Sequence, residues 1–277
     1  MKIQNKTLEN GFTIPLIGKG TWMPNLGRKP RPNLNDEKFM EELQVAIDMG
    51  ISYIDTAERY MNGYREKLVG QVIKGKQREK LFLVSKVSSD NLEYKNVIGS
   101  AKASIKRLQT SYLDLYLIHQ FNPSIDLKET MRAMDYLIYH KLIKNIGVCN
   151  FTVKQLQEAQ SYTKNKIVVN QLHLNLMYRS PEQMEVVKYC QKNDIMVIAW
   201  RPFQQNLLTP KIKILLEEMA SKYARTPFQI ATAWLTSQPN IVVLTNLDNA
   251  TQIENVTDAI QVQIEQKDLE KFNNNHN

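Results

Sequence analysis

A carboxylate and a phenol lie five residues apart where an apolar, partly β-branched run ends. The run spans residues 51–54, Asp55 follows it directly, and Tyr60 comes next in polar surroundings. A buried strand ends where its backbone pairing stops, so Asp55 is expected at the rim of a sheet, with Tyr60 in the loop or helical turn beyond. These two groups suit proton transfer, provided that a neighbour lowers the phenol pKa from about 10. Alternatively, Asp55 only caps the next helix and Tyr60 only packs.

Short apolar runs alternate with amphipathic stretches along the chain. The expected strands cover residues 16–21, 51–55, 81–86, 113–119, 145–150, 167–171, 195–200 and 241–244. The expected helices cover residues 36–49, 64–76, 95–108, 127–141, 152–161, 181–193 and 211–237, with one more after the last strand. Residues 211–237 are expected to form two helices, because Thr226 can cap a helix that Pro227 opens. A hairpin is expected at residues 2–15, with Lys2 and Ile3 in its first strand and a turn at Glu9-Asn10-Gly11.

Strands that alternate with helices pair in parallel, because parallel neighbours need crossover connections. Eight strands in about 250 residues predict an α/β fold, a single (β/α)₈ TIM barrel with an N-terminal β-hairpin, over residues 1–277 as one domain. The tail at residues 273–277 is expected to be disordered. A doubly wound open sheet is the alternative, but Gly18-Lys19-Gly20-Thr21-Trp22-Met23 lacks the third glycine that such a fold would use for a dinucleotide.

Barrel enzymes carry their chemistry at the carboxyl ends of the strands. Seven of the expected strands end on a group that can donate, accept, ionise or stack: Thr21, Asp55, Lys86, His119, Asn150, Gln171 and Trp200. Taken singly, Lys86 can be a solvated strand end and His119 a histidine near the core. Seven such groups at one rim indicate a site.

The types of these residues suggest a proton donor with its helpers. Lys86 beside Asp55 would form a partly buried ion pair, and this cation would lower the pKa of Tyr60 towards neutrality. His119 can donate a hydrogen bond to a substrate oxygen and hold it in line. The set suits protonation of an oxygen on which negative charge develops, as in carbonyl reduction. Because no side chain delivers hydride, a nicotinamide cofactor is implied, with Trp200 stacked on its ring.

Composition excludes several other classes of protein. The chain is 43% hydrophobic and 23% charged, and its net charge of +8 is spread along the sequence rather than concentrated on one basic face, so we expect no nucleic-acid partner. No apolar run is long enough for a membrane span, and residues 1–5 lack a secretory core. The two cysteines, Cys149 and Cys190, and the four histidines show no disulfide or metal-ligand spacing. We expect a cytoplasmic monomer without a metal, acting on a small molecule.

Several segments, in order over nearly the whole chain, resemble the aldo-keto reductase family. They are Gly18-Lys19-Gly20-Thr21-Trp22, Ile54-Asp55-Thr56-Ala57-Glu58-Arg59-Tyr60, Gly63-Tyr64-Arg65-Glu66, Leu83-Val84-Ser85-Lys86, Tyr112-Leu113-Asp114-Leu115-Tyr116-Leu117-Ile118-His119, Ile146-Gly147-Val148-Cys149-Asn150-Phe151 and Val169-Asn170-Gln171. The resemblance implies a (β/α)₈ barrel that reduces aldehydes and ketones with a nicotinamide cofactor. It implies that Tyr60 is the general acid, that Asp55 and Lys86 tune it, and that His119 orients the carbonyl. Trp22, Tyr60 and His119 would then contact the substrate.

The same resemblance implies a cofactor site, from which this chain departs at several positions. The implied site consists of Gly20, Thr21, Trp22, Asp55, Asn150, Gln171, Trp200, Arg201, Pro202, Phe203, Thr245, Asn246, Gln252 and Asn255. Cys149 and Arg201 replace serines that the family often has, and Arg201 could reach the cofactor phosphates. Asn246 and Gln252 replace the lysine and arginine that grip a 2′-phosphate in the family. We expect NADPH as the cofactor, with NADH as the alternative.

The loop at residues 120–124 is short, which predicts an open site with broad tolerance for aldehydes. A cofactor-binding regulatory protein and a structural protein of the lens type, each with little turnover, are alternatives on the same fold. The complete set of Asp55, Tyr60, Lys86 and His119 argues against both, because a binding protein does not need all four. A metal-dependent hydrolase in the same barrel is a further alternative.

Overall fold

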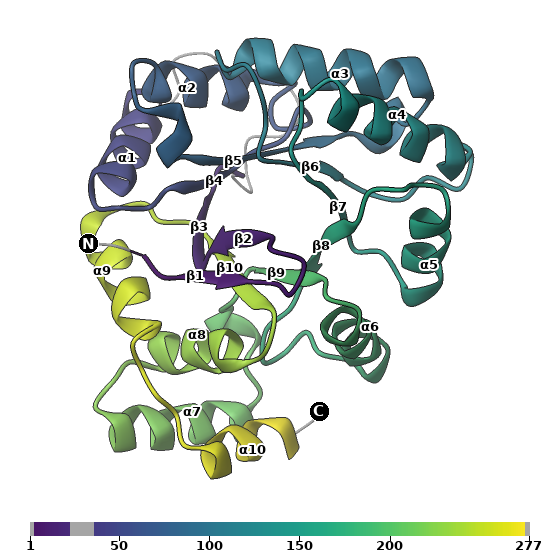
Figure 1. Ribbon diagram of the computed structural model, residues 1–277. Helices are drawn as coiled ribbons and strands as arrows, with labels where there is room; N and C mark the ends of the chain where they lie inside the picture. Colours follow the sequence, from purple (N-terminus) through teal and green to yellow (C-terminus); the bar gives the residue numbers. More distant parts are fainter. Residues whose placement is uncertain (1–2, 23–35, 275–277) are drawn as a thin grey trace.

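The computed structural model describes residues 3–22 and 36–274 of the chain. Within these ranges a closed barrel of parallel strands is surrounded by helices, as expected (Figure 1). Its strands, in order around the barrel, are β3 (Ile17–Gly20), β4 (Tyr53–Asp55), β5 (Phe82–Val87), β6 (Leu115–Ile118), β7 (Ile146–Cys149), β8 (Ile167–His173), β9 (Met196–Trp200) and β10 (Ile241–Thr245), which pairs with β3 to close the ring. The (β/α)₈ fold class is confirmed, and the open sheet is excluded because β10 pairs with β3.

Helices cover the outer face of the barrel (Figure 1). They are α1 (Asp36–Asp48), α2 (Tyr64–Ile73), α3 (Tyr94–Arg107), α4 (Leu127–Tyr139), α5 (Val153–Ser161), α6 (Pro181–Lys192), α7 (Pro210–Tyr223), α8 (Pro227–Ser237), α9 (Ala250–Ala259) and α10 (Gln266–Asn274), with short 3₁₀ helices at Arg78–Lys80, Ser89–Asn91 and Gln205–Leu207. Residues 211–237 do form two helices. The second begins with a capping box, in which the Thr226 side chain accepts from the backbone N–H of Gln229 and the Gln229 side chain accepts from the backbone N–H of Thr226.

The N-terminal hairpin is present, but its first strand lies further along the chain than expected. Strand β1 (Asn5–Thr7) pairs antiparallel with β2 (Thr13–Pro15). Of the two residues expected in the first strand, Ile3 is not in a strand and Lys2 lies outside the described residues. The reason is the turn, which includes Phe12: the N–H of Leu8 donates to the carbonyl of Phe12 at 2.9 Å. The buried Phe12 ring meets the ring of Phe82 edge-on at the start of β5. The hairpin therefore packs on the amino-terminal end of the barrel strands, opposite the expected site.

Two helices follow the last strand, where one was expected. Helix α10 packs against α7, and its residues Asn273 and Asn274 are helical rather than disordered as the sequence suggested. The physical reason is a side-chain contact, because the indole Nε1 of Trp234 donates to Oδ1 of Asn273 at 3.1 Å. The remaining residues of the expected disordered tail, 275–277, lie outside the described part of the chain. None of the helices in the described ranges has the length and apolar character that crossing a membrane would require.

Candidate active site

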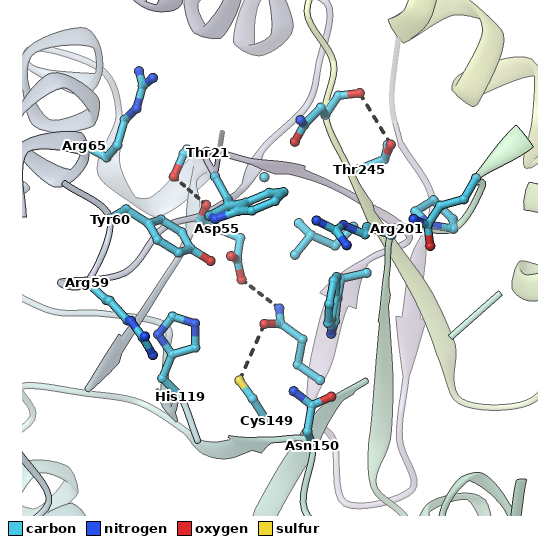
Figure 2. Close-up of a pocket in the computed structure, with 18 of the residues that line it drawn as sticks. Thr21, Asp55, Arg59, Tyr60, Arg65, His119, Cys149, Asn150, Arg201 and Thr245 are labelled. Carbon is cyan, nitrogen blue, oxygen red and sulfur yellow. Dashed lines mark hydrogen bonds between the residues drawn. The ribbon is translucent and has the colours of Figure 1, made fainter. Parts of the chain in front are cut away.

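The carboxyl ends of the strands surround a cavity of about 820 Å³ (Figure 2). Its walls come from the segments after β3, β4, β6, β7, β8, β9 and β10. The lining residues are Gly20, Thr21, Trp22, Asp55, Arg59, Tyr60, Met61, Arg65, His119, Cys149, Asn150, Gln171, Trp200, Arg201, Pro202, Phe203, Gln204, Leu244, Thr245 and Asn246. Most of the residues singled out from the sequence are thus brought together from distant parts of the chain.

A buried ion pair forms the floor of the cavity. Lys86 and Asp55 are both essentially inaccessible to solvent, and Nζ of Lys86 donates to Oδ1 of Asp55 and to the carbonyl of Thr56. The second carboxylate oxygen of Asp55 accepts from Nε2 of Gln171 at 3.0 Å. Burial opposes the positive charge of Lys86, but the contact with Asp55 outweighs burial and raises the pKa of Lys86 above its usual value. Lys86 therefore stays charged at the base of the site.

Tyr60 lies beside this ion pair, but its acidity differs from the expectation. Nζ of Lys86 is 5.3 Å from the centroid of the Tyr60 ring. Burial and the charge of Asp55 together raise the pKa of Tyr60 to about 12, although Lys86 acts in the opposite direction. The prediction of a pKa near neutrality was wrong, because burial disfavours the phenolate more than one lysine favours it. Tyr60 is consequently a protonated phenol at neutral pH, ready to donate.

His119 lies next to the phenol, with the two rings edge-to-face at a centroid distance of 5.7 Å. Burial, together with the positive charges of Lys86 and Arg59, lowers the pKa of His119 to about 3. A neutral imidazole carries one N–H, so it can donate a single hydrogen bond without acting as a strong acid. Tyr60 and His119 thus present two donors at the same end of the cavity.

A chain of hydrogen bonds runs from the wall of the cavity to the carboxylate. The thiol of Cys149 donates to Oε1 of Gln171 at 3.5 Å, and Gln171 donates to Asp55 (Figure 2). Burial raises the pKa of Cys149 to about 12, so the group remains a thiol and can act as this donor. Cys149 therefore fills the donor role that a serine hydroxyl could fill, and the side-chain amide of Gln171 has a defined orientation.

Trp200 belongs to a stack of aromatic rings that the sequence did not reveal. The ring of His173 lies between those of Trp200 and Tyr178, at centroid distances of 4.3 and 3.7 Å. Nε2 of His173 is also 2.8 Å from Oε1 of Gln204. No sequence signal connects these residues, because they come from β8, β9 and the loops that follow. The stack fixes the plane of the Trp200 indole at the cavity wall.

Arg201 bridges the two tryptophans of the cavity. Its guanidinium carbon is 4.7 Å from the ring centroid of Trp22 and 5.2 Å from that of Trp200. Arg201 has a left-handed backbone conformation, with φ of 53°, which follows the end of β9 directly. The arginine thus follows the carboxyl end of β9, and Thr245 and Asn246 line the same cavity.

Two residues of the implied cofactor set do not line the cavity. The side chain of Gln252 accepts from the backbone N–H of Asp248 at 2.8 Å, and its own backbone N–H donates to Asn249, the N-cap of α9. Asn255 lies one turn further along α9, and its carbonyl accepts from the side chain of Gln229. Gln252 thus takes part in the hydrogen bonds at the start of α9, since the polar backbone groups there need partners.

The cavity is also lined by residues that were not expected there from the sequence. They are Arg59, Met61, Arg65, Cys149, Gln204 and Leu244. Arg59 directly precedes Tyr60, so adjacency was a usable signal for it. Within residues 3–22 and 36–274, no group of three or more His, Cys, Asp or Glu side chains is arranged to hold a metal ion.

The residues present fit a nicotinamide dinucleotide. The cavity is within the range of about 300–1,000 Å³ that is typical of small-molecule sites. It offers a flat indole, two side-chain amides and a proton donor at one end, and a guanidinium with hydroxyl and amide groups at the rim. These features match a flat ring with a carboxamide and an anionic tail.

Comparison with known proteins agrees with this fold and shows the family. The family model for the aldo/keto reductase family matches residues 16–275, and the chain therefore belongs to the aldo/keto reductase family. The chain is 31% identical to a methylglyoxal reductase, YeaE, of Escherichia coli strain K12, over 93% of this chain and 89% of that protein. It is 32% identical to a glyoxal reductase of Bacillus subtilis strain 168, over 96% and 90% of the two chains.

Solved structures show the same architecture. A thermostable aldo-keto reductase solved with the inhibitor epalrestat superposes with a TM-score of 0.94, at 37% identity, over 98% of this chain and 99% of that chain. An aldo/keto reductase from Klebsiella pneumoniae, solved with NADP and acetate, has a TM-score of 0.85 at 28% identity, over 99% and 95% of the chains.

Proposed function

We propose that this protein reduces an aldehyde or ketone with hydride from NADPH, and that Tyr60 is the general acid. The observation that carries the proposal is the pairing of Tyr60 and His119, two neutral donors 5.7 Å apart between ring centroids, above a buried ion pair. This arrangement can bind a carbonyl oxygen and supply the proton that it needs during reduction. Membership of the family supports the same reaction.

Each catalytic residue has a distinct task. Tyr60 gives its proton to the carbonyl oxygen as negative charge develops there, and the positive charge of Lys86 stabilises the phenolate that remains. Asp55 holds Lys86 in place and keeps it charged. His119 is neutral, so it donates a hydrogen bond that orients the carbonyl but does not compete as the acid.

The cofactor would lie between these groups and the rim. NADPH supplies the hydride when bound, which no side chain can do. Trp200 would stack on its ring, and Asn150 and Gln171 would bind its carboxamide. Arg201, with Thr245 and Asn246, would bind the phosphates, while Gln252 keeps its capping role. Relatives solved with NADP or NADPH support NADPH over NADH.

The substrate is proposed to be a small carbonyl compound. The relatives named as methylglyoxal reductase and glyoxal reductase support an aldehyde. Trp22, with 38% of its surface exposed, would form part of the substrate wall. We also propose that the chain acts as a single-domain monomer in the cytoplasm, a compartment in which its two buried free cysteines would stay reduced.

Replacing Tyr60 by Phe tests the proposal directly. The variant should bind NADPH nearly as the parent does, because the hydroxyl group alone is removed. Its carbonyl reduction should fall by at least ~10²-fold, the lower range for the loss of a general acid. Unchanged activity would show that another group is the acid. An inactive parent that binds NADPH tightly would instead favour a cofactor-binding regulatory role.

Cofactor preference is measured by titrating the protein with NADPH and with NADH. Binding is followed through the quenching of tryptophan emission, which Trp200 should report if it stacks on the nicotinamide. Tight binding of NADPH alone would point to Arg201 as the phosphate contact, and the Arg201→Met variant should then lose that preference. Equal binding of the two would show that Asn246 and Gln252 leave the preference relaxed. Failure to bind either would refute the proposal.

A further inference from the structure

The cavity carries an excess of positive charge. Among the described residues, its walls contain the guanidinium groups of Arg59, Arg65 and Arg201, and a single carboxylate, Asp55, which is already bound to Lys86. An arginine of this wall that no protein group already engages is therefore available to an anionic ligand.

Two of the three arginines have identified neighbours. Arg65 is buried, with its guanidinium 4.1 Å from the ring centroid of Phe39, and the charges of Asp36 and Glu42 act on it. Arg201 lies over two indoles on the side of the cavity where the phosphates of the cofactor are proposed to bind.

Arg59 is different. No hydrogen bond, ion pair or ring contact connects it to any residue in the described part of the chain. Its side chain is partly buried and lines the cavity, so its guanidinium is less fully hydrated than one on an open surface. A partly desolvated guanidinium favours an anionic partner.

The position of Arg59 associates it with the substrate rather than with the cofactor. It precedes Tyr60 in the segment after β4, and its side chain lies close to His119, whose pKa its charge lowers (Figure 2). The groups proposed to hold the cofactor follow β7, β8, β9 and β10. A carbonyl bound by Tyr60 and His119 therefore has Arg59 on its own side of the cavity.

We propose that Arg59 binds a carboxylate on the substrate, so that the preferred substrates are aldehydes or ketones that also carry a carboxylate group. This inference rests on the proposed reductase function and narrows its substrate class. The planar fork of an arginine matches the two oxygens of a carboxylate, which a neutral aldehyde lacks. The charge on Arg59 then selects among carbonyl compounds without taking part in the chemical step.

The test compares two aldehydes that differ in one charge. 4-Carboxybenzaldehyde and its methyl ester have similar carbonyl groups, and kcat/KM is measured for each with saturating NADPH. The parent protein should prefer the carboxylate, and the ratio of the two kcat/KM values should fall by about 10- to 100-fold in Arg59→Met. Arg59→Lys should recover part of the ratio. The kcat/KM values of the 2- and 3-carboxy isomers then show at which distance from the carbonyl the carboxylate is recognised best.

A matched control removes an arginine elsewhere. Arg132 is exposed on α4 and paired with Glu129, so Arg132→Met should leave the ratio unchanged. An equal loss for both aldehydes in Arg59→Met would overturn the inference, because Arg59 would then act through His119 or through the fold. An unchanged ratio would overturn it while the reductase function stands. If no aldehyde were turned over by the parent, the proposed function would fail, and the inference with it.

Discussion

Replacing Lys86 by Met separates the stability that the buried ion pair provides from its effect on Tyr60. The Lys86 side chain is fully buried, and its removal leaves the Asp55 carboxylate with Gln171 and a long contact to Tyr53 as its remaining hydrogen-bond partners among the described residues. Breaking a buried pair by removing one partner typically costs about 3–5 kcal/mol. The Lys86→Met variant should therefore unfold at a clearly lower urea concentration.

The catalytic effect follows from distance. If the 5.3 Å between Nζ and the centroid of the Tyr60 ring is taken as the charge separation, Coulomb's law at an effective dielectric constant of about 20 gives roughly 3 kcal/mol between the ammonium and a phenolate. Loss of this attraction raises an already high pKa, and corresponds to a decrease of about 10²-fold in the rate of proton donation. The assay is steady-state reduction of an aldehyde, followed by the loss of NADPH absorbance.

A double variant distinguishes the two effects. Adding Asp55→Asn to Lys86→Met removes the uncompensated carboxylate, so much of the lost stability should return, while the activity should remain low. Unfolding is measured in urea, and activity is measured where both variants are folded. Wild-type activity in Lys86→Met would refute the electrostatic role of Lys86. Activity that returns together with stability would show that Lys86 acts only through the fold.

Three further predictions concern pH, the cofactor and packing. The pKa of His119 is depressed from 6.5 to about 3, so the stability that the neutral imidazole contributes is complete above pH 6.5 and is lost as the pH falls. The free energy of unfolding should therefore be lower by roughly 2 kcal/mol at pH 5 than above pH 6.5. A His119→Gln variant should lose less over the same change in pH. Asn246→Lys places a cation at the exposed rim of the cavity and should tighten NADPH binding by about 3- to 5-fold, with NADH as the control ligand. An equal gain in affinity for both cofactors would contradict a contact with the 2′-phosphate. Gly70→Ala should destabilise the protein by about 1–3 kcal/mol, because the added Cβ would lie 2.4 Å from the Arg107 carbonyl oxygen. Gly99→Ala, in open space on α3, should instead stabilise it by about 0.5–1 kcal/mol. Similar thermal shifts for the two variants would contradict the packing argument.

The order of strands and helices and the position of most of the site could be predicted from the sequence. Apolar runs of strand length recur between amphipathic stretches, and the barrel geometry brings the carboxyl ends of those runs to one rim. Asp55, His119 and Gln171 are far apart in the chain but share this property, which is why they were found. Such a prediction needs only local patterns and one topological rule.

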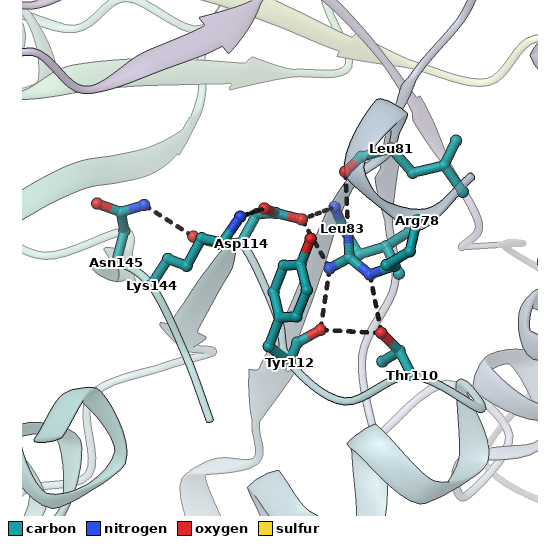
Figure 3. A network of polar contacts seen from close by, with 8 residues as sticks. All are labelled: Arg78, Leu81, Leu83, Thr110, Tyr112, Asp114, Lys144 and Asn145. Carbon is teal, nitrogen blue, oxygen red and sulfur yellow. Dashed lines mark hydrogen bonds and ion pairs between the residues drawn. The ribbon is translucent and has the colours of Figure 1, made fainter. Parts of the chain in front are cut away.

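The roles of polar residues at the other end of the barrel could be assigned only from the structure. Asp114 lies within one of the segments that resemble the family, yet its carboxylate binds Arg78 at 2.7 Å and Lys144 at 3.0 Å, and accepts from the backbone N–H of Leu83 (Figure 3). It precedes β6, so it lies at the amino-terminal end of the strands, away from the cavity. A carboxylate in a family segment is therefore structural here, and its sequence position alone did not distinguish the two roles.

By itself, the sequence determined which groups reach the rim, because strand periodicity and strand ends are local properties of the chain. Only the tertiary structure decided how those groups behave. Burial from several elements raises the pKa of Tyr60 that Lys86 alone would lower, and the start of α9 occupies Gln252. The same packing leaves Arg59 without a protein partner among the described residues. Burial and pairing depend on every neighbour in space, and no local pattern in the sequence records them.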